Sequence, residues 1–151
     1  MTEPKPEIVD AFVGAVVRVM QISLGEDAQQ IATSYATELD PPPSIAVSIS
    51  LSGNLRGPVT WSFSRPLARQ VTESMLMGAA AEEYYAGAVA ELANMMLGNA
   101  VAALEDAGYL VELAPPSMSP ERPQDAPRAL VVAITIPSGE MKLMFDLEEA
   151  A

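Results

Sequence analysis

Apolar residues recur every three to four positions over three stretches of the chain, which is the spacing of helices that bury one face. The pattern predicts helices over 7–24, 65–77 and 82–107. Ser64 directly precedes the second of these stretches and is expected to cap it, and Gly78 is expected to close it. The third stretch is the longest and is rich in Ala and Met.

Apolar and polar residues alternate strictly over 44–51 and again over 57–63, which is the pattern of half-buried strands. The linking sequence SGNLRGP is rich in turn residues, so these two strands are predicted to form a hairpin. A second hairpin is predicted from 129–136 and 140–147, joined by a Pro-Ser-Gly turn. Weaker strand signals lie at 27–38 and 109–113.

Prolines interrupt the chain at two places. The run 40–43, Asp-Pro-Pro-Pro, predicts an extended break. The segment 114–128 carries five prolines and is predicted to be an exposed loop without regular structure. The acidic tail after Leu147 is expected to fray.

These elements predict an α+β fold in one domain spanning residues 1–151: an antiparallel sheet built from hairpins and covered by three helices, one of them long. Trp61 is the only tryptophan. It alternates with Val59 and Phe63, so we expect all three in the core, although an exposed tryptophan could serve as a stacking platform.

On a helical wheel, the longest helix separates into an apolar face and a narrow polar face. Gly and Asn both disfavour helix, so their presence mid-helix on the polar face needs a reason. Glycines one turn before Glu91 and one turn after Asn94 would leave these two side chains standing above a surface that another backbone could approach. By spacing alone, Glu91 could equally be an ordinary solvated carboxylate. The predicted core face is Tyr85, Val89, Leu92, Met96, Ala100, Ala103 and Ala107, and the predicted polar face is Glu83, Gly87, Glu91, Asn94, Gly98 and Glu105.

Composition removes several classes of function. The net charge of −12 opposes binding to nucleic acids and to anionic lipid surfaces. The chain has no Cys and no His, which excludes disulfides, thiolate nucleophiles and Ser-His-Asp hydrolysis, and removes the commonest metal ligand. No metal motif is found. The first ten residues lack a basic segment leading into a hydrophobic core, so we expect a soluble, cytoplasmic protein.

Two segments, ISLSGNLRGPVTWSFSRPLARQVTESMLMG and AVAELANMMLGNAVAALEDAGYLVELAPPSM, resemble the CheC/CheX/FliY family of chemotaxis phosphatases in that order. The single E-x-x-N copy in ELANMMLGN is most similar to the CheX branch. The residue four before Glu91, often Asp or Ser in CheC and FliY copies, is Gly87 here.

The resemblance implies hydrolysis of the aspartyl phosphate of a CheY-like response regulator. It implies that Asn94 orients the attacking water and that Glu91 pairs with the regulator's active-site lysine. Partner contacts are then expected from Gly87, Ala90, Met95 and Gly98. No cofactor is expected in this chain, because Mg²⁺ would be supplied by the regulator.

Two other classes of function remain open on the sequence. The chain could be a non-catalytic module that binds a phosphorylated regulator or another signalling partner. It could also be a structural dimerisation domain. CheX-like chains often dimerise through their sheets, and the apolar final hairpin is expected to supply such an edge.

Overall fold

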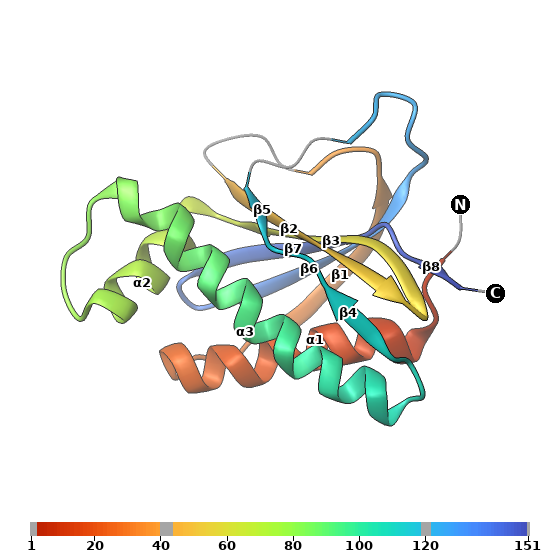
Figure 1. Ribbon diagram of the computed structural model, residues 1–151. Helices are drawn as coiled ribbons and strands as arrows, with labels where there is room; N and C mark the ends of the chain where they lie inside the picture. The colour runs from red at the N-terminus through yellow and green to blue at the C-terminus, as the bar shows by residue number, and fades with distance from the viewer. Residues whose placement is uncertain (1–2, 40–43, 119–121, 151) are drawn as a thin grey trace.

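The computed structural model describes residues 3–39, 44–118 and 122–150 (Figure 1). The predicted break at 40–43 therefore lies outside the described residues. Helices and strands follow in the order α1 (Pro6–Leu24), β1 (Gln29–Ala36), β2 (Ile45–Gly53), β3 (Leu55–Phe63), α2 (Arg65–Leu76), η1 (Glu82–Tyr84), α3 (Tyr85–Asp106), β4 (Val111–Leu113), β5 (Ser117–Met118), β6 (Ala129–Ile136), β7 (Gly139–Phe145) and β8 (Glu148–Glu149).

The strands form one antiparallel sheet in the order β1-β6-β7-β3-β2-β4, with β5 paired to β2 and β8 to β3. Both predicted hairpins are present, as β2–β3 and β6–β7. The expectation that the final hairpin supplies a free edge is wrong. β6 is covered by β1 and β7 by β3, so β1 is one edge of the sheet and β4 with β5 forms the other.

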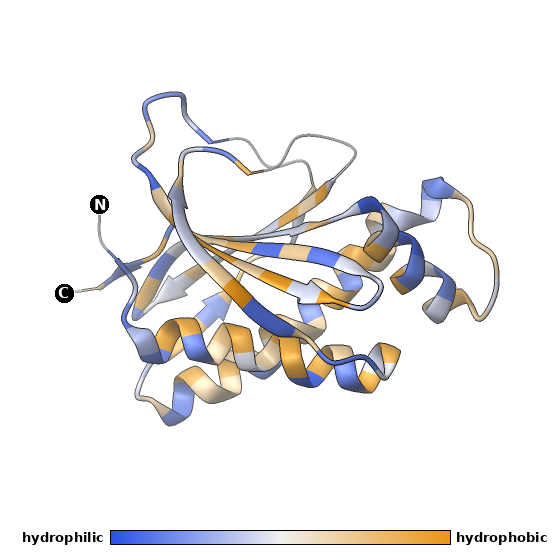
Figure 2. Cartoon of the chain, turned by 180° about the vertical axis from the view of Figure 1, so that it is seen from behind, coloured by the Kyte–Doolittle hydropathy of each residue, from blue (hydrophilic) through white to orange (hydrophobic). Residues whose placement is uncertain are grey.

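The helices lie along one face of the sheet, with α1 and α2 both packed against α3 (Figure 1). Hydrophobic residues alternate with polar ones along the strands and along the helices, as Figure 2 shows from behind. This alternation places one side of each central strand in the core under the helices. The α+β architecture with three helices, one of them long, is therefore confirmed.

Trp61 belongs to this core and is 1% exposed, so it offers no stacking surface. Its ring lies 6.1 Å from that of Phe12 in a tilted arrangement, and Phe12 also meets Phe145 edge-on at 5.4 Å. Val59 and Phe63 are fully buried beside it. The indole nitrogen has no hydrogen-bond partner among the described residues.

On the opposite face of the sheet, a smaller buried cluster is formed by Ala129, Val131 and Met144, with Ala36 and Leu39 packed against it. Arg122, in the proline-rich loop, makes a two-pronged ion pair with Asp146 at 2.6 and 3.0 Å. It also donates to the carbonyls of Thr37 and Pro127 at 2.6 and 2.7 Å. A single half-buried guanidinium thus ties two connections to the end of β7, because its planar fork can satisfy several acceptors at once.

Two segments predicted to lack regular structure form short strands instead. In the loop 114–128, Ser117–Met118 pairs with β2. In the acidic tail, Glu148–Glu149 pairs with the start of β3, and the amide of Ala150 donates to the carbonyl of Asn54 at 2.9 Å. Both pairings complete backbone hydrogen bonds at exposed strand edges, a long-range effect that composition does not show.

The end of α2 also differs from the prediction. Ser64 caps the helix as expected, its side chain accepting from the amide of Leu67. The helix ends at Leu76, one residue early, so the left-handed position falls on Met77, with φ 57°, and not on Gly78. Met77 is the only non-glycine residue with positive φ in the described part of the chain.

One helical region of the described chain, Glu82–Asp106, is long and apolar enough to cross a membrane by length and composition alone. Its buried side chains pack on α1, α2 and the sheet, as in the core helix of a folded domain.

Candidate functional site

Helix α3 has the two faces that the sequence predicts, with the buried face turned slightly from its expected direction. Ala103 is only half-buried and Ala107 is exposed, while Leu97 and Leu104, which are not on the predicted core face, are fully buried. Larger side chains displace the alanines because they bury more apolar area. The buried residues of α3 are Tyr85, Val89, Leu92, Ala93, Met96, Leu97, Ala100 and Leu104.

All six residues of the predicted polar face are exposed. Glu91 and Asn94 lie one turn apart on this face and project from the same side of the helix. Neither side chain makes a hydrogen bond or ion pair with any described residue, so both are available to a partner. We call the exposed residues Gly87, Glu91, Asn94, Met95 and Gly98 the α3 stripe.

The glycines of the stripe have no role inside the molecule. A Cβ added at Gly87 or at Gly98 would have no neighbour within 4 Å, so neither glycine is required by packing. Each costs about 1 kcal/mol of helix stability relative to Ala. The result is a lowered surface on each side of Glu91 and Asn94, which a partner could approach closely.

The other two candidate contact residues differ from each other. Met95 is 37% exposed, next to Asn94. Ala90 is half-buried and packs against the core, so much of its methyl group is already covered.

Sequence reasoning missed a contact between α1 and α3 at the border of the stripe. The guanidinium of Arg18 donates to the side-chain oxygen of Asn99 at 3.4 Å. The amide of Asn99 in turn donates to the carbonyl of Met95 at 3.1 Å. Arg18 and Asn99 are 81 positions apart in the sequence. The only feature of the sequence that singles out Arg18 is that it interrupts an apolar run. The contact places one cation beside the stripe.

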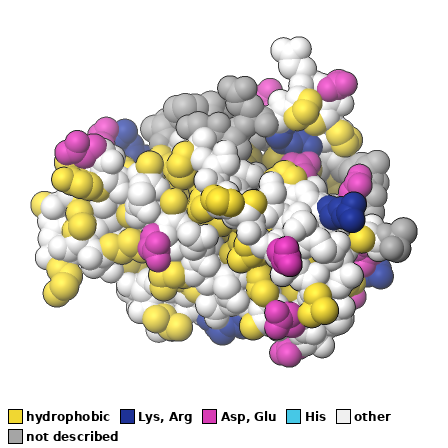
Figure 3. Space-filling view, in the orientation of Figure 1, with side chains coloured by type: hydrophobic (Ala, Val, Ile, Leu, Met, Phe, Trp, Pro, Cys, Tyr) yellow, Lys and Arg dark blue, Asp and Glu magenta, His cyan; other side chains and the backbone are white. Residues whose placement is uncertain are grey.

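Four ion pairs between described residues use the cations Lys5, Arg65, Arg69 and Arg122, and none of these four pairs involves a stripe residue. The described residues contain no group of three or more acidic side chains placed to hold a metal ion. The stripe therefore offers one carboxylate and one amide on a convex helix, shown in Figure 3 on the face that carries α3. Such a surface suits insertion into a partner's pocket more than enclosure of a small molecule.

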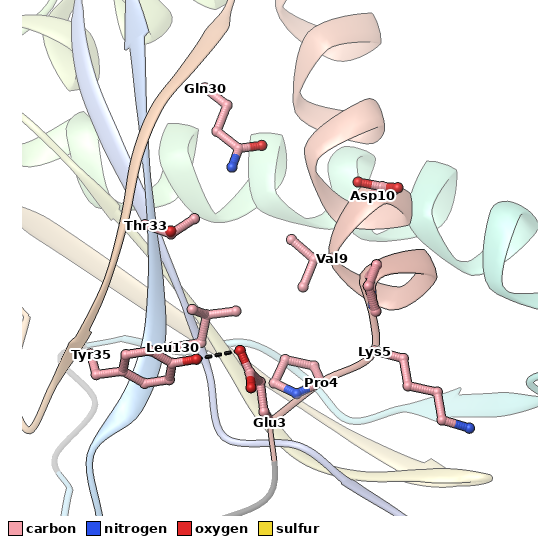
Figure 4. A pocket seen from close by; sticks show the side chains of 10 residues that line it. Glu3, Pro4, Lys5, Val9, Asp10, Gln30, Thr33, Tyr35 and Leu130 are labelled. Carbon is pink, nitrogen blue, oxygen red and sulfur yellow. Dashed lines mark hydrogen bonds between the residues drawn. The ribbon is translucent and has the colours of Figure 1, made fainter.

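A groove of about 520 Å³ lies elsewhere, between the start of α1 and the edge strand β1 (Figure 4). Tyr35 and Glu3 point toward one another across it and are hydrogen-bonded. Thr33 and Asp10 line the same groove. None of the candidate residues on α3 lines it, so it is a separate feature.

Comparison with known proteins decides the family. The model of the family described as "Chemotaxis phosphatase CheX" matches residues 45–137, more than half of the chain. The chain belongs to the CheX family. The matched region includes α3 and the whole stripe.

Individual members agree with this assignment. The CheY-P phosphatase CheX of Thermotoga maritima is 29% identical over 114 residues, which are 74% of each chain. Among solved structures, the chemotaxis protein CheX of Desulfovibrio desulfuricans has the same fold, with a TM-score of 0.78 and 22% identity over 94% of this chain and 99% of that one. A CheX chain of Borrelia burgdorferi, solved as a CheX-CheY-BeF3-Mg²⁺ complex, matches 94% of this chain and 98% of its own, with a TM-score of 0.66 and 19% identity.

Proposed function

We propose that this chain hydrolyses the aspartyl phosphate of a CheY-like response regulator. Membership of the CheX family and the CheY-P phosphatase name of the Thermotoga maritima relative support this activity. The observation that carries it here is the pair Glu91 and Asn94, exposed and without partners on a helix face whose glycines serve no internal packing.

Asn94 is the residue that we assign to the reaction. Water attacks the phosphorus atom, the bond between phosphorus and the aspartyl oxygen breaks, and inorganic phosphate and a free carboxylate are released. The Asn94 carbonyl would accept a hydrogen bond from the attacking water, while its NH₂ group donates to a phosphoryl oxygen. An amide is too weak a base to abstract a proton, so its contribution is to hold the water in line with the scissile bond.

Glu91 would dock the two proteins. Its carboxylate stands one turn before Asn94 and forms no ion pair with any described residue. A charge-assisted bond to a lysine of the regulator's active site would fix the helix relative to the phosphate. Glu91 would thereby fix how far the Asn94 side chain extends toward the phosphate. The stripe residues Gly87, Met95 and Gly98, with the exposed part of Ala90, would form the surrounding contact.

The metal of the reaction belongs, in this proposal, to the substrate protein. Phosphoryl transfer requires charge neutralisation at the phosphoryl oxygens, which Mg²⁺ bound to the regulator would supply. The chain then needs to contribute only positioning, which agrees with a site lacking His and Cys.

The decay of a phosphorylated CheY-like regulator tests the proposal, with wild type, Asn94→Ala and Glu91→Ala compared. We expect the wild type to accelerate decay, Asn94→Ala to lose turnover by roughly 100-fold or more while still binding, and Glu91→Ala to bind more weakly. If the phosphorylated regulator binds but does not decay faster with wild type, the catalytic assignment is wrong and the chain is a binding module.

We further propose that the chain is a cytoplasmic homodimer joined through an exposed sheet edge. The described structure favours β1 as that edge, because residues 29–34 of β1 are all exposed and its outer side has no neighbouring strand. Light scattering at micromolar concentration should give twice the chain mass of 16.0 kDa. A monomer would contradict the dimer, and membrane association on cell fractionation would contradict the location.

A further inference from the structure

Arg18 differs from the basic residues that form the ion pairs described above. The chain has 8 Lys and Arg residues against 20 acidic ones, so carboxylates greatly outnumber the cations. Arg18 is nevertheless exposed and forms no ion pair with any described residue. Its positive charge is therefore not neutralised by a carboxylate within the described part of the chain.

A neutral amide holds the Arg18 guanidinium against α3. Helices α1 and α3 lie side by side (Figure 1), and Nε of Arg18 donates to the side-chain oxygen of Asn99 at 3.4 Å. The side-chain NH₂ group of Asn99 is itself fixed, because it donates to the carbonyl of Met95 at 3.1 Å. A carboxylate in place of this amide would form an ion pair and neutralise the guanidinium. The amide instead orients the guanidinium and leaves its charge available.

Two residues that disfavour helix flank the guanidinium. Asn99 lies inside α3, and Gly14 lies inside α1, one turn before Arg18. Apart from the backbone of its own helix, a Cβ added at Gly14 would meet only Nη1 of Arg18, at 3.4 Å. Packing against the sheet or another helix therefore does not require a glycine there. Two such residues around one exposed arginine point to a function for this arginine beyond the fold.

The guanidinium lies at the border of the α3 stripe. Asn99 follows Asn94 by five residues, which is about 7.5 Å along the helix axis. Asn99 is also hydrogen-bonded to the backbone of Met95, a stripe residue. A specific interface covers about 800 Å² on each partner, equivalent to a disc of about 16 Å radius. A protein that docks on Glu91 and Asn94 over such an area therefore also covers the Arg18 guanidinium.

The charge of the docked protein gives the reason to expect a contact there. In the proposed function, the regulator's site carries an anionic phosphoryl group and the carboxylates that bind Mg²⁺, and the metal offsets only part of this negative charge. The present chain has a net charge of −12 and so repels an acidic surface overall. Arg18 supplies local attraction beside the stripe, and a guanidinium is well suited to pair with carboxylates.

We propose that Arg18 is a docking residue for the phosphorylated response regulator, pairing with a carboxylate at the rim of its phosphorylation pocket, and that Asn99 positions Arg18. This inference rests on the proposed function, because it takes the regulator to be the protein docked on the stripe. Arg18 then adds a contact of opposite sign to that of Glu91. The two charges require an anion and a cation at a fixed spacing on the regulator. This requirement selects one orientation and distinguishes one regulator from another.

Arg18→Gln tests the contact, because it removes the charge and keeps a polar side chain. The affinity for a beryllofluoride-activated CheY-like regulator with Mg²⁺ should fall by about fivefold, mainly through slower association. The affinity should also depend less on salt concentration than that of wild type. In regulator dephosphorylation, KM should rise by a similar factor while kcat changes little. The unfolding midpoint should stay the same, because the lost hydrogen bond is exposed.

Two further variants separate the charge from its positioning. Arg18→Lys keeps the charge and should recover most of the affinity. Asn99→Ala keeps Arg18 but releases the guanidinium, so binding should weaken by about twofold. The unfolding midpoint of Asn99→Ala should stay equal or rise, because Ala favours helix more than Asn does. A fall in the midpoint without a change in affinity would show that Asn99 only joins α1 to α3 and would overturn its positioning role.

Arg128→Gln is the matched control. Arg128 is exposed and forms no ion pair with any described residue. It directly precedes Ala129, which belongs to the cluster on the sheet face opposite the helices. The same charge is removed there, so the affinity should change by less than about twofold.

The outcomes distinguish this proposal from the proposed function. If Arg18→Gln binds the activated regulator as tightly as wild type, or if Arg128→Gln loses as much affinity, the docking role of Arg18 is overturned while the phosphatase assignment stands. If Arg18→Gln lowers kcat and leaves the affinity unchanged, the docking role is also overturned. If the wild type neither binds nor dephosphorylates any regulator, both proposals fail together.

Discussion

Glycines occur in two regions of this molecule for opposite reasons. At the end of the β2–β3 hairpin, Gly53 and Gly57 have φ of 103° and 117°, and an added Cβ would lie 2.5 and 2.1 Å from the carbonyl oxygens of Leu110 and Asp146. In α3, Gly87 and Gly98 are helical, and an added Cβ would have no neighbour within 4 Å. The fold requires the first pair but not the second. Because packing does not require glycine at Gly87 and Gly98, we attribute these two residues to contact with a partner protein.

Gly57→Ala should have the largest effect on stability. The new methyl group meets backbone atoms, which cannot move aside as a flexible side chain can. We expect a loss of about 2–4 kcal/mol in the free energy of unfolding, measured by urea denaturation. Gly25→Ala is the control, because Gly25 has φ 65° but open space around it, and should lose only about 1 kcal/mol. Equal losses at both positions would show that the backbone contact is unimportant.

Gly87→Ala and Gly98→Ala should act in the opposite direction. With open space for the methyl group, each should raise the free energy of unfolding by roughly 0.5–1 kcal/mol, because Ala favours helix. Each should also weaken binding of the activated regulator. The converse change at an exposed residue of the same helix, Ala102→Gly, should lower stability by about 1 kcal/mol. If the two glycine variants are stabilised and bind normally, the glycines do not serve the partner.

A smaller effect is expected near the hairpin end, at Tyr109. Its hydroxyl is hydrogen-bonded to Glu149 at 2.8 Å and lies 3.1 Å from a carboxylate oxygen of Glu7. The bond to Glu149, with desolvation and the contact to Glu7, raises the pKa of Tyr109 to about 12 from its ordinary 10.0. A raised pKa means that the folded protein holds this proton more tightly than the unfolded chain does. The resulting stability is present below pH 10 and is lost as the pH rises toward 12.

Tyr109→Phe checks this effect. The stability difference between wild type and variant should be present below pH 10 and disappear near pH 12. Absorbance titration should show one tyrosine fewer ionising near pH 12 in the variant. Regulator binding should not change, because Tyr109 lies near the hairpin end and is not a residue of the α3 stripe. A variant that differs from wild type equally at all pH values would contradict the role of the hydroxyl proton.

The sequence predicted most of the elements because their signals are local. The long periodic run of α3 placed Glu91 and Asn94 on its exposed face, and strict alternation located both hairpins. It failed where distant segments meet. β8 depends on pairing between Leu55 and Glu149, and the edge position of β1 depends on the order of the whole sheet. The left-handed Met77 was missed because Gly78 is the more favourable residue for that conformation.

The candidate site shows the same difference between features with local sequence signals and features that depend on contacts between distant segments. The unusual residues of the stripe were visible in the sequence because Gly and Asn oppose helix formation. The contact of Arg18 with Asn99 was not, because it joins two helices that are adjacent only after folding.

A titration followed by amide resonances tests the central claim most directly. Isotope-labelled protein would be titrated with a beryllofluoride-activated CheY-like regulator and Mg²⁺, and the four glycine amides compared in one spectrum. We predict that Gly87 and Gly98 shift or broaden strongly while Gly53 and Gly57 remain unchanged. If the hairpin glycines respond and those of α3 do not, the regulator docks elsewhere, and the stripe is not its binding surface.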